Sequence, residues 1–326
     1  MIGSFFRAWA RALVVSGACV PVFDAAAEYP DRPIRYIVPV AVGGAGDISA
    51  RLLTSELAIQ MNQPFVIDNR ASSGGIIGVQ LLAGTRPDGY TLGYGNMVHL
   101  AINQSLVPNL PYDADRQLQL IGQFASNQNV LAVRLPLPVK SVQELIAHAR
   151  SNPDKLSFAS TGNGSTQHLS GELFKQMTGT RIVHVPYKAV SQALTDLIAG
   201  QIDLIFDVQS TITPFAHAAK VRPLAVTGAV RSTVFPDVPT MSEAGVRGYE
   251  ITTWSGMMGP AGLSRALVTK LNAEMQRACL SPKLQAALAA QGSVCATGSP
   301  EQFAQFVKTE RVKWGDIVKR SGARID

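Results

Sequence analysis

Short runs of apolar residues alternate along this chain with longer segments in which apolar positions recur every three or four residues. The short runs have the length of buried strands, and the longer segments have the periodicity of amphipathic helices. In the first third of the chain this pattern predicts strands at 34–38, 65–67 and 90–94, and a helix at 47–61 with Asp47 as its N-cap. Such alternation is typical of parallel sheets covered by helices.

The middle of the chain repeats the pattern. Ser141 and Glu144 have the spacing of a capping box, which predicts a helix that stops near Asn152. Amphipathic segments around Leu169 and Leu197 predict two further helices. Between these helices the apolar runs predict the strands of a second sheet, at 156–159, 182–186, 202–206 and 223–226.

The last part of the chain is predicted to be helical, because Ser264, Ser281 and Ser299 each stand where an N-cap is expected. We expect these helices to return to the first sheet, so that the chain crosses between two α/β domains twice. Two crossovers make a hinge with a cleft beside it. The predicted division is domain 1 at 28–128 and 253–326, and domain 2 at 129–252.

The N-terminus has the features of a secretory signal peptide at residues 1–27. Arg7 and Arg11 precede an apolar run at 12–22, and Ala25 and Ala27 supply the small residues that signal peptidase requires. The apolar run is about half of the roughly 20 residues that a membrane anchor needs, and no later segment could span a membrane. We therefore expect a periplasmic protein that begins at Glu28.

The chain has three cysteines. Lipidation at Cys19 is an alternative to simple cleavage, although residues 16–18 lack the large aliphatic residue expected there. After cleavage, Cys279 and Cys295 remain, and in an oxidising compartment they are a candidate disulfide.

Composition and charge remove several classes of function. The 326 residues are 46% hydrophobic and 16% charged, which is typical of a globular protein. The net charge is +6, but the basic residues are dispersed, so nucleic acid is not an expected partner. The five histidines lack the spacing of metal ligands, and no known catalytic motif is present. We expect no metal, no cofactor and no catalysis. A catalytic base that belongs to no known motif, such as Asp47 or Asp207, is the alternative.

The first glycine loop, residues 43–47, lies between a predicted strand and a predicted helix. N–H groups exposed at a helix start bind anions, which makes ligand-binding candidates of Gly43, Gly44, Ala45, Gly46 and Asp47. We expect a branched side chain at Gly44 to block the site, because that position is expected to approach the ligand and to need a positive φ. A dinucleotide fingerprint ending at Asp68 and a purely structural turn are the alternatives. Asp47 would repel a pyrophosphate.

The second glycine loop, residues 160–166, also lies between a strand and a helix, in the other domain. Its candidate ligand contacts are Thr161, Gly162, Ser165 and Thr166, and a loop in each half predicts a ligand held between the domains. Gly95 and Asn96 end a strand where open α/β sheets bind ligands. For Arg70 a surface ion pair is favoured over ligand contact.

The chain resembles the substrate-binding receptors of tripartite tricarboxylate transporters, the Bug (TctC-like) family. The resemblance covers nearly the whole mature chain, in motifs that include Pro87-Asp88-Gly89-Tyr90, Gly162-Asn163-Gly164-Ser165 and His184-Val185-Pro186-Tyr187-Lys188, with others at 29–35, 43–47, 69–78, 110–113 and 236–240.

The resemblance implies a Venus-flytrap periplasmic binding protein (type II-like) that captures a small organic carboxylate with its two glycine loops. Asp47 and Asp207 would lie near the ligand. The implied partners are the membrane subunits of a tripartite tricarboxylate transporter or, alternatively, a sensor kinase, and the implied state is a monomer. An enzyme on the same fold is a further alternative.

The chain departs from the family pattern where the loop normally carries a hydroxyl residue before Asp47, because Gly46 stands there. Ile76, Ala189 and Val208 also replace the residues usually found. The more apolar pocket edge favours an aromatic or branched carboxylate over a small amino dicarboxylate.

Overall fold

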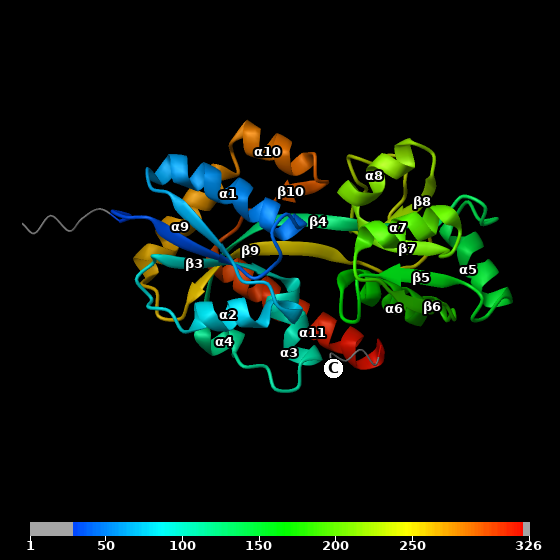
Figure 1. Cartoon of the computed structure of the whole chain (residues 1–326), viewed down its shortest axis with the longest axis horizontal. Helices are drawn as coiled ribbons and strands as arrows, with labels where there is room; N and C mark the ends of the chain where they lie inside the picture. The colour runs from blue at the N-terminus through cyan, green and yellow to red at the C-terminus, as the bar shows by residue number, and fades with distance from the viewer. Residues whose placement is uncertain (1–28, 322–326) are drawn as a thin grey trace, which may run out of the picture.

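The computed structural model describes residues 29–321, which form two lobes side by side (Figure 1). Within these residues a ten-stranded sheet runs through both lobes, in the order β2-β1-β3-β9-β4-β7-β5-β6, with β8 and β10 also paired to β4. The predicted signal peptide, its cleavage site and Cys19 lie outside the described residues. No helix of residues 29–321 is both long and apolar enough to cross a bilayer.

The first lobe begins with three parallel strands, β1 (Ile34–Val38), β2 (Phe65–Asn69) and β3 (Thr91–Asn96), with β1 in the middle. Ile37 packs in one hydrophobic cluster and Ile34, Tyr36 and Val38 pack in another, so both faces of β1 are covered and these four side chains are completely buried. The helices of this part are α1 (Ala45–Met61), α2 (Ile76–Ala83), α3 (Asn103–Leu106) and α4 (Ala114–Gln117), together with a 3₁₀-helical turn, η1 (Ser73–Gly75), and a π-helical segment, η2 (Val98–Ile102).

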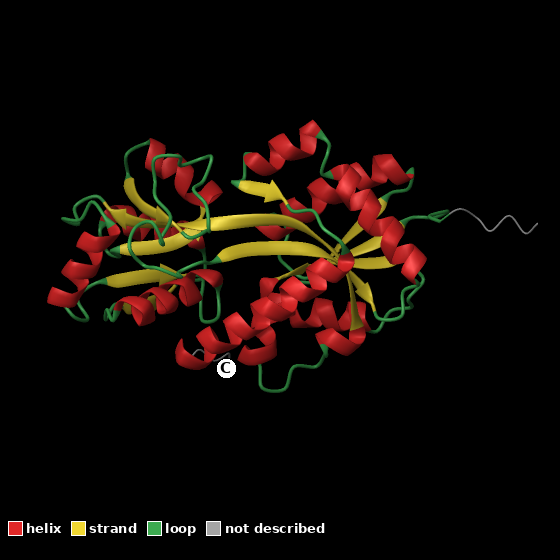
Figure 2. Ribbon diagram, turned by 180° about the vertical axis from the view of Figure 1, so that it is seen from behind, coloured by secondary structure: helices red, strands yellow, loops and turns green. Residues whose placement is uncertain are grey.

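Two long strands join the lobes, and the sequence pattern did not predict either of them. β4 (Leu118–Arg134) pairs with β9 (Thr252–Pro260) as far as Gln128, and from Asn129 onward it pairs with β7 and β8. Both strands pass from lobe to lobe in Figure 2. Their pairings are antiparallel, so the sheet is mixed, and the predicted parallel pairing holds among the shorter strands of each lobe but not for these two.

The second lobe contains parallel strands β5 (Ser157–Ser160), β6 (Val183–Pro186) and β7 (Leu204–Val208), together with β8 (Val221–Val226). Its helices are α5 (Val142–Ser151), α6 (Thr166–Thr178), α7 (Val190–Ala199) and α8 (Gln209–His217). The predicted strands are present with ends shifted by up to two residues. Ser141 caps α5 as predicted, because its Oγ accepts the Glu144 N–H, but Glu144 accepts the N–H of Lys140, the residue before the N-cap, so only half of the predicted capping box is present.

The C-terminal segment returns to the first lobe as α9 (Arg265–Ala278), α10 (Pro282–Ala289), the unpredicted strand β10 (Ser293–Cys295) and α11 (Pro300–Ser321). Ser264, Ser281 and Ser299 accept N–H groups at the three helix starts, as predicted. A disulfide joins Cys279 to Cys295, which confirms the predicted pair and ties β10 to the end of α9. α11 packs on β4 and also contacts α6 of the second lobe.

Candidate functional site

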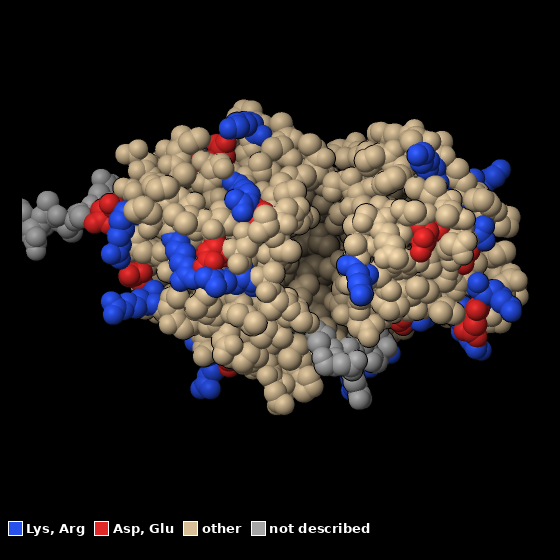
Figure 3. All heavy atoms as spheres, in the orientation of Figure 1, with Lys and Arg blue, Asp and Glu red and all other residues tan. Residues whose placement is uncertain are grey.

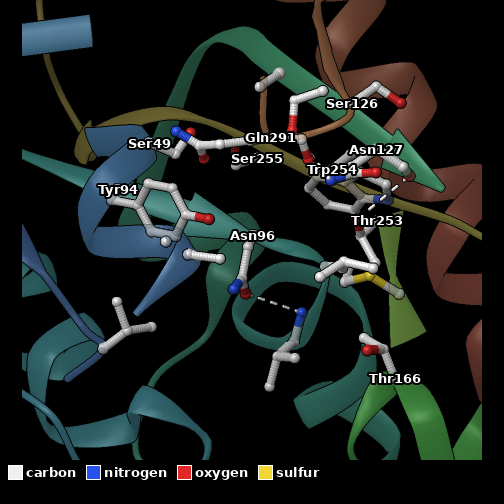
Figure 4. Close-up of a pocket in the computed structure, with 18 of the residues that line it drawn as sticks. Ser49, Tyr94, Asn96, Ser126, Asn127, Thr166, Thr253, Trp254, Ser255 and Gln291 are labelled. Carbon is white, nitrogen blue, oxygen red and sulfur yellow. Dashed lines mark hydrogen bonds between the residues drawn. The ribbon is translucent and has the colours of Figure 1, made fainter. Parts of the chain in front are cut away.

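A cleft lies between the lobes and is visible as a hollow in the surface (Figure 3). It contains a cavity of about 200 Å³. Both lobes and the hinge strands contribute to its lining, which consists of Val40, Ala45, Gly46, Ser49, Tyr94, Asn96, Met97, Val98, Ala125, Ser126, Asn127, Thr166, Val208, Ser210, Thr253, Trp254, Ser255, Gln291 and Ser293. Figure 4 shows how the labelled polar side chains surround a common space.

The chemistry of this lining is neutral. Every side chain in it is uncharged, and most of the polar ones are hydroxyls or amides, which both donate and accept hydrogen bonds. Trp254, Met97 and Val40 add apolar surface on the other parts of the wall. The cavity is therefore suited to a ligand that has hydrogen-bonding ends and an apolar body.

Three helices begin at the cavity. α1 contributes Ala45 and Gly46 from its first turn, α6 contributes its first residue, Thr166, and α8 contributes Ser210 together with its N-cap, Val208. The N–H groups of a first helical turn lack intrahelical partners, and the helix dipole places partial positive charge there. The site thus presents positive potential from both lobes without a cationic side chain in the lining.

The first glycine loop places only part of its candidates in the cavity. Ala45 and Gly46 line it, whereas Gly43, Gly44 and Asp47 do not. A Cβ on Gly46 would lie 3.1 Å from Val40 Cγ2 and 3.2 Å from the Tyr94 hydroxyl oxygen, so a larger residue there would crowd the wall. The positive φ of +77° belongs to Gly43, and Gly44 has an ordinary φ of −72°, so the expected strain at Gly44 was wrong.

Asp47 holds the first glycine loop from within. The helix begins at Ala45 with Gly44 as its N-cap, so the prediction of Asp47 as the N-cap was wrong. The Asp47 carboxylate instead accepts hydrogen bonds from the Gly43 N–H, from Arg51 Nε and from Asn69 Nδ2, each at 2.9 Å. Burial alone would raise the pKa of Asp47, but these hydrogen bonds outweigh it and lower the pKa to about 2. Asp47 is therefore ionised and engaged within the loop.

The second glycine loop places Thr166 in the cavity, whereas Thr161, Gly162 and Ser165 do not line it. Ser165 Oγ accepts the His168 N–H and is the N-cap of α6. Thr161 is exposed and donates to Gln167 Oε1.

Of the three remaining candidates, Asn96 lines the cavity, whereas Gly95 and Asp207 do not. Asn96 lines the cavity, and its Oδ1 accepts the N–H groups of Val98 and His99. Gly95 lies behind it, where an added Cβ would meet Met258 Sδ at 2.9 Å. Asp207 is buried and does not line the cavity, and burial raises its pKa to about 6 against hydrogen bonds from the Val208 N–H and from Gln167.

Residues outside the glycine loops make up much of the lining, and the sequence reasoning missed them. The hinge strands supply Ser126, Asn127, Thr253, Trp254 and Ser255, the turn before β10 supplies Gln291, and β10 itself begins with Ser293. A signal for the hinge residues was present, because a run of small polar residues at 126–129 interrupts an otherwise apolar segment. Arg70 forms an ion pair with Asp68 at 2.8 Å, and this surface pair is the role that was favoured for it.

Two lobes that share crossing strands, with a polar cleft between them, define a solute-binding protein of the periplasmic type. The family model described as "Tripartite tricarboxylate transporter family receptor" matches residues 49–323. The chain belongs to this family of receptors.

Relatives with similar sequences cover nearly the whole chain. The UPF0065 protein in the tcbD-tcbE intergenic region of Pseudomonas sp. (strain P51) is 37% identical, over 89% of this chain and 86% of that protein. Protein BugT of Bordetella pertussis is 33% identical over 96% of each chain.

Solved structures with similar folds include R. palustris Rpa4515 with adipate, at a TM-score of 0.81 and 36% identity over 91% of this chain and all of that one. The periplasmic binding protein BugD is similar at a TM-score of 0.77 and 31% identity, over 91% of this chain and 99% of that one. MatC of Rhodopseudomonas palustris with bound malate has a TM-score of 0.76 at 31% identity, over 89% of this chain and all of that one.

Proposed function

We propose that this chain is a periplasmic receptor that captures a small organic carboxylate in the cleft and delivers it to the membrane subunits of a tripartite tricarboxylate transporter. One observation carries the proposal. Three helix N-termini from two lobes, α1, α6 and α8, open onto one cavity whose lining contains no acidic side chain. Unpaired N–H groups and helix dipoles stabilise a carboxylate at such a place by about 0.3 to 1 kcal/mol for each helix.

The preferred ligand is a carboxylate with an apolar body. Because no acidic side chain lines the cavity, an ammonium group would lose its hydration without gaining a counter-charge, which disfavours an amino dicarboxylate. Trp254 and Met97 offer apolar and aromatic surface to a linear, branched or aromatic body. The related Rpa4515 was solved with adipate, which belongs to that class, and we propose adipate as the first ligand to test.

Ligand capture is proposed to close the two lobes about the hinge strands. We assign domain 1 to residues 28–128 and 253–326 and domain 2 to residues 129–252. The support is that β4 changes partner between Gln128 and Asn129, and that β9 begins at Thr252. The protein acts as an exported monomer without enzymatic activity, after removal of residues 1–27.

A thermal-shift and calorimetry panel tests the ligand class. Adipate, malate, benzoate, glutamate and the neutral analogue adipamide are compared at neutral pH. A carboxylate at 100 times its dissociation constant should add about 2.7 kcal/mol to the free energy of unfolding, and adipamide should add little. Stabilisation by adipamide equal to that by adipate would contradict the anion-binding proposal.

A matched pair of variants locates the site. Thr166→Val removes a hydroxyl from the cavity wall and should weaken carboxylate binding by roughly tenfold, since a hydrogen bond is worth about 1 to 1.5 kcal/mol. Thr195→Val changes an exposed threonine on α7 and should leave affinity unchanged. Equal effects of the two changes would place the ligand elsewhere.

The partner is tested in cells. Deletion of the gene should abolish uptake of the labelled ligand if the chain serves a transporter. Intact uptake with a lost transcriptional response would favour the sensor-kinase alternative.

A further inference from the structure

Two histidines lie behind the second glycine loop and fix its backbone. The Gly164 N–H donates to His168 Nδ1 at 3.1 Å, and both residues are buried. An imidazole nitrogen accepts a hydrogen bond only when it carries no proton, so this contact requires a neutral His168 with its proton on Nε2.

The second histidine acts through Ser160. The Ser160 hydroxyl oxygen accepts the Gly162 N–H at 3.0 Å, lies 3.2 Å from the Gly162 carbonyl oxygen and lies 2.6 Å from His184 Nε2. A hydroxyl has one proton and two lone pairs. All three contacts are satisfied when His184 Nε2 donates to Ser160 and Ser160 donates to the Gly162 carbonyl.

The loop that these contacts shape reaches both the cavity and the other lobe. Thr166, at its end, lines the cavity. Gly164 has a φ of +76°, and a Cβ there would lie 2.3 Å from Leu106 Cδ2 of α3 in the first lobe. The backbone of the loop therefore sits where the lobes meet.

The two imidazole rings lie against each other, with their planes inclined by 30°, in a setting that resists protonation. Their ring centroids are 4.1 Å apart, and Phe158 of β5 lies 4.9 Å from the His184 ring. Burial is the main cause that lowers the pKa of each histidine to about 4. The positive charge of Lys175 lowers the pKa of His168 further, and a positive charge on His168 would lower that of His184. A proton on either ring would therefore be costly while the loop is in place.

The charged groups around the pair do not offset this effect. Glu172 Oε1 is 3.9 Å from His168 Nε2, but the same oxygen pairs with Lys175 Nζ at 2.7 Å. On α11, which packs against α6, Arg320 lines the same surface pocket as Glu172 and is paired with Asp316 at 2.7 Å. No free acidic group among these neighbours is positioned to stabilise a protonated pair.

We propose that His168 and His184 are positioning residues for ligand capture, whose rings hold the second glycine loop in its ligand-holding shape, and that protonation of His168 breaks its contact with the Gly164 N–H and releases the loop and the ligand. The inference rests on the proposed carboxylate-binding function for its effect on affinity. Its effect on the loop requires no ligand.

The first experiment follows the loop without ligand. Nitrogen-15 spectra of the ligand-free protein are recorded from neutral pH to about pH 3.5, and the Gly164 amide is compared with the ring nitrogens of His168. Both should change with one midpoint. His168→Asn places an amide oxygen near the position of Nδ1 and cannot titrate, so in that variant the Gly164 amide should keep its shift. A Gly164 amide chemical shift that stays constant while His168 titrates would overturn the proposal.

The second experiment measures adipate affinity in the wild type and in His168→Asn. Adipate itself gains protons in acid, but this affects both proteins equally. The ratio of the wild-type association constant to that of His168→Asn therefore reports only the effect of the histidine. The ratio should be close to one at neutral pH. With a pKa of about 4, it should fall to about one quarter at about pH 3.5.

Further variants distinguish the hydrogen bonds that the two histidines make from the simple packing of their rings. His184→Gln keeps an amide donor near Ser160 and should bind adipate like the wild type, whereas His184→Leu and His168→Phe should bind at least tenfold more weakly. Wild-type affinity in His168→Phe, or an affinity ratio independent of pH, would refute the positioning role. If adipate binds to none of the proteins, the proposed ligand fails, and the ligand-free spectra still decide whether the histidines hold the loop.

Discussion

Replacing Asp47 by asparagine separates two roles that a buried acid beside the proposed anion site could have. The side chain is only 2% exposed, and its two oxygens accept three hydrogen bonds, from the Gly43 N–H, Arg51 and Asn69. If Asp47 supports the first glycine loop, Asp47→Asn should weaken both stability and binding. If it faced the ligand, removing its negative charge should strengthen the binding of a carboxylate.

The magnitude follows from the lowered pKa. A change from 3.8 to about 2 corresponds to about 2 kcal/mol. Because the folded pKa of Asp47 is the lower one, this stability is fully present above about pH 4 and is lost as the pH falls through about 2. Asparagine must also turn its NH₂ group toward one of the donors, which leaves a buried group unpaired at about 1 to 3 kcal/mol. Together the two effects give an expected loss of about 3 to 5 kcal/mol at neutral pH.

Urea denaturation of Asp47→Asn and the wild type at neutral pH measures the stability change, and calorimetry with adipate measures binding. Asp316→Asn is the matched control, because Asp316 is exposed and forms an i,i+4 pair with Arg320. That change should cost less than about 0.5 kcal/mol. Unchanged stability together with tighter adipate binding in Asp47→Asn would refute the supporting role.

Three further changes test the framework around the cleft. Cys279→Ser opens a disulfide between residues separated by 16 positions and should lower the free energy of unfolding by about 3 kcal/mol, measured by urea denaturation under non-reducing conditions. Glu310→Leu leaves the buried indole N–H of Trp254, now bonded at 2.8 Å, without its acceptor and should cost at least about 2 kcal/mol; Glu310→Gln should cost less than half as much. Gly164→Ala forces a left-handed backbone on alanine against Leu106 and should lower the melting temperature by several degrees.

Features encoded by a few neighbouring residues could be predicted from the sequence. Ser141, Ser264 and Ser299 cap helices as expected, because a cap depends on one side chain and the N–H groups two or three residues later. The disulfide was predictable because Cys279 and Cys295 were the cysteines left after the predicted cleavage. The exact start of α1 was not predictable, because Asp47 bonds to Arg51 and to Asn69 instead of capping the helix, and Asn69 belongs to a strand 22 residues away in the sequence.

The hinge strands escaped prediction for a physical reason that also explains the site. A strand buried on both faces is read from its apolar residues, but β4 and β9 carry Ser126, Asn127, Thr253 and Ser255 where they leave the core and form the floor of the cleft. Those polar residues weaken the strand pattern because they face the cavity. Natural sequences break their local rules at functional sites. In this chain, the segment with the weakest strand signal is therefore the one that joins the lobes and lines the cavity between them.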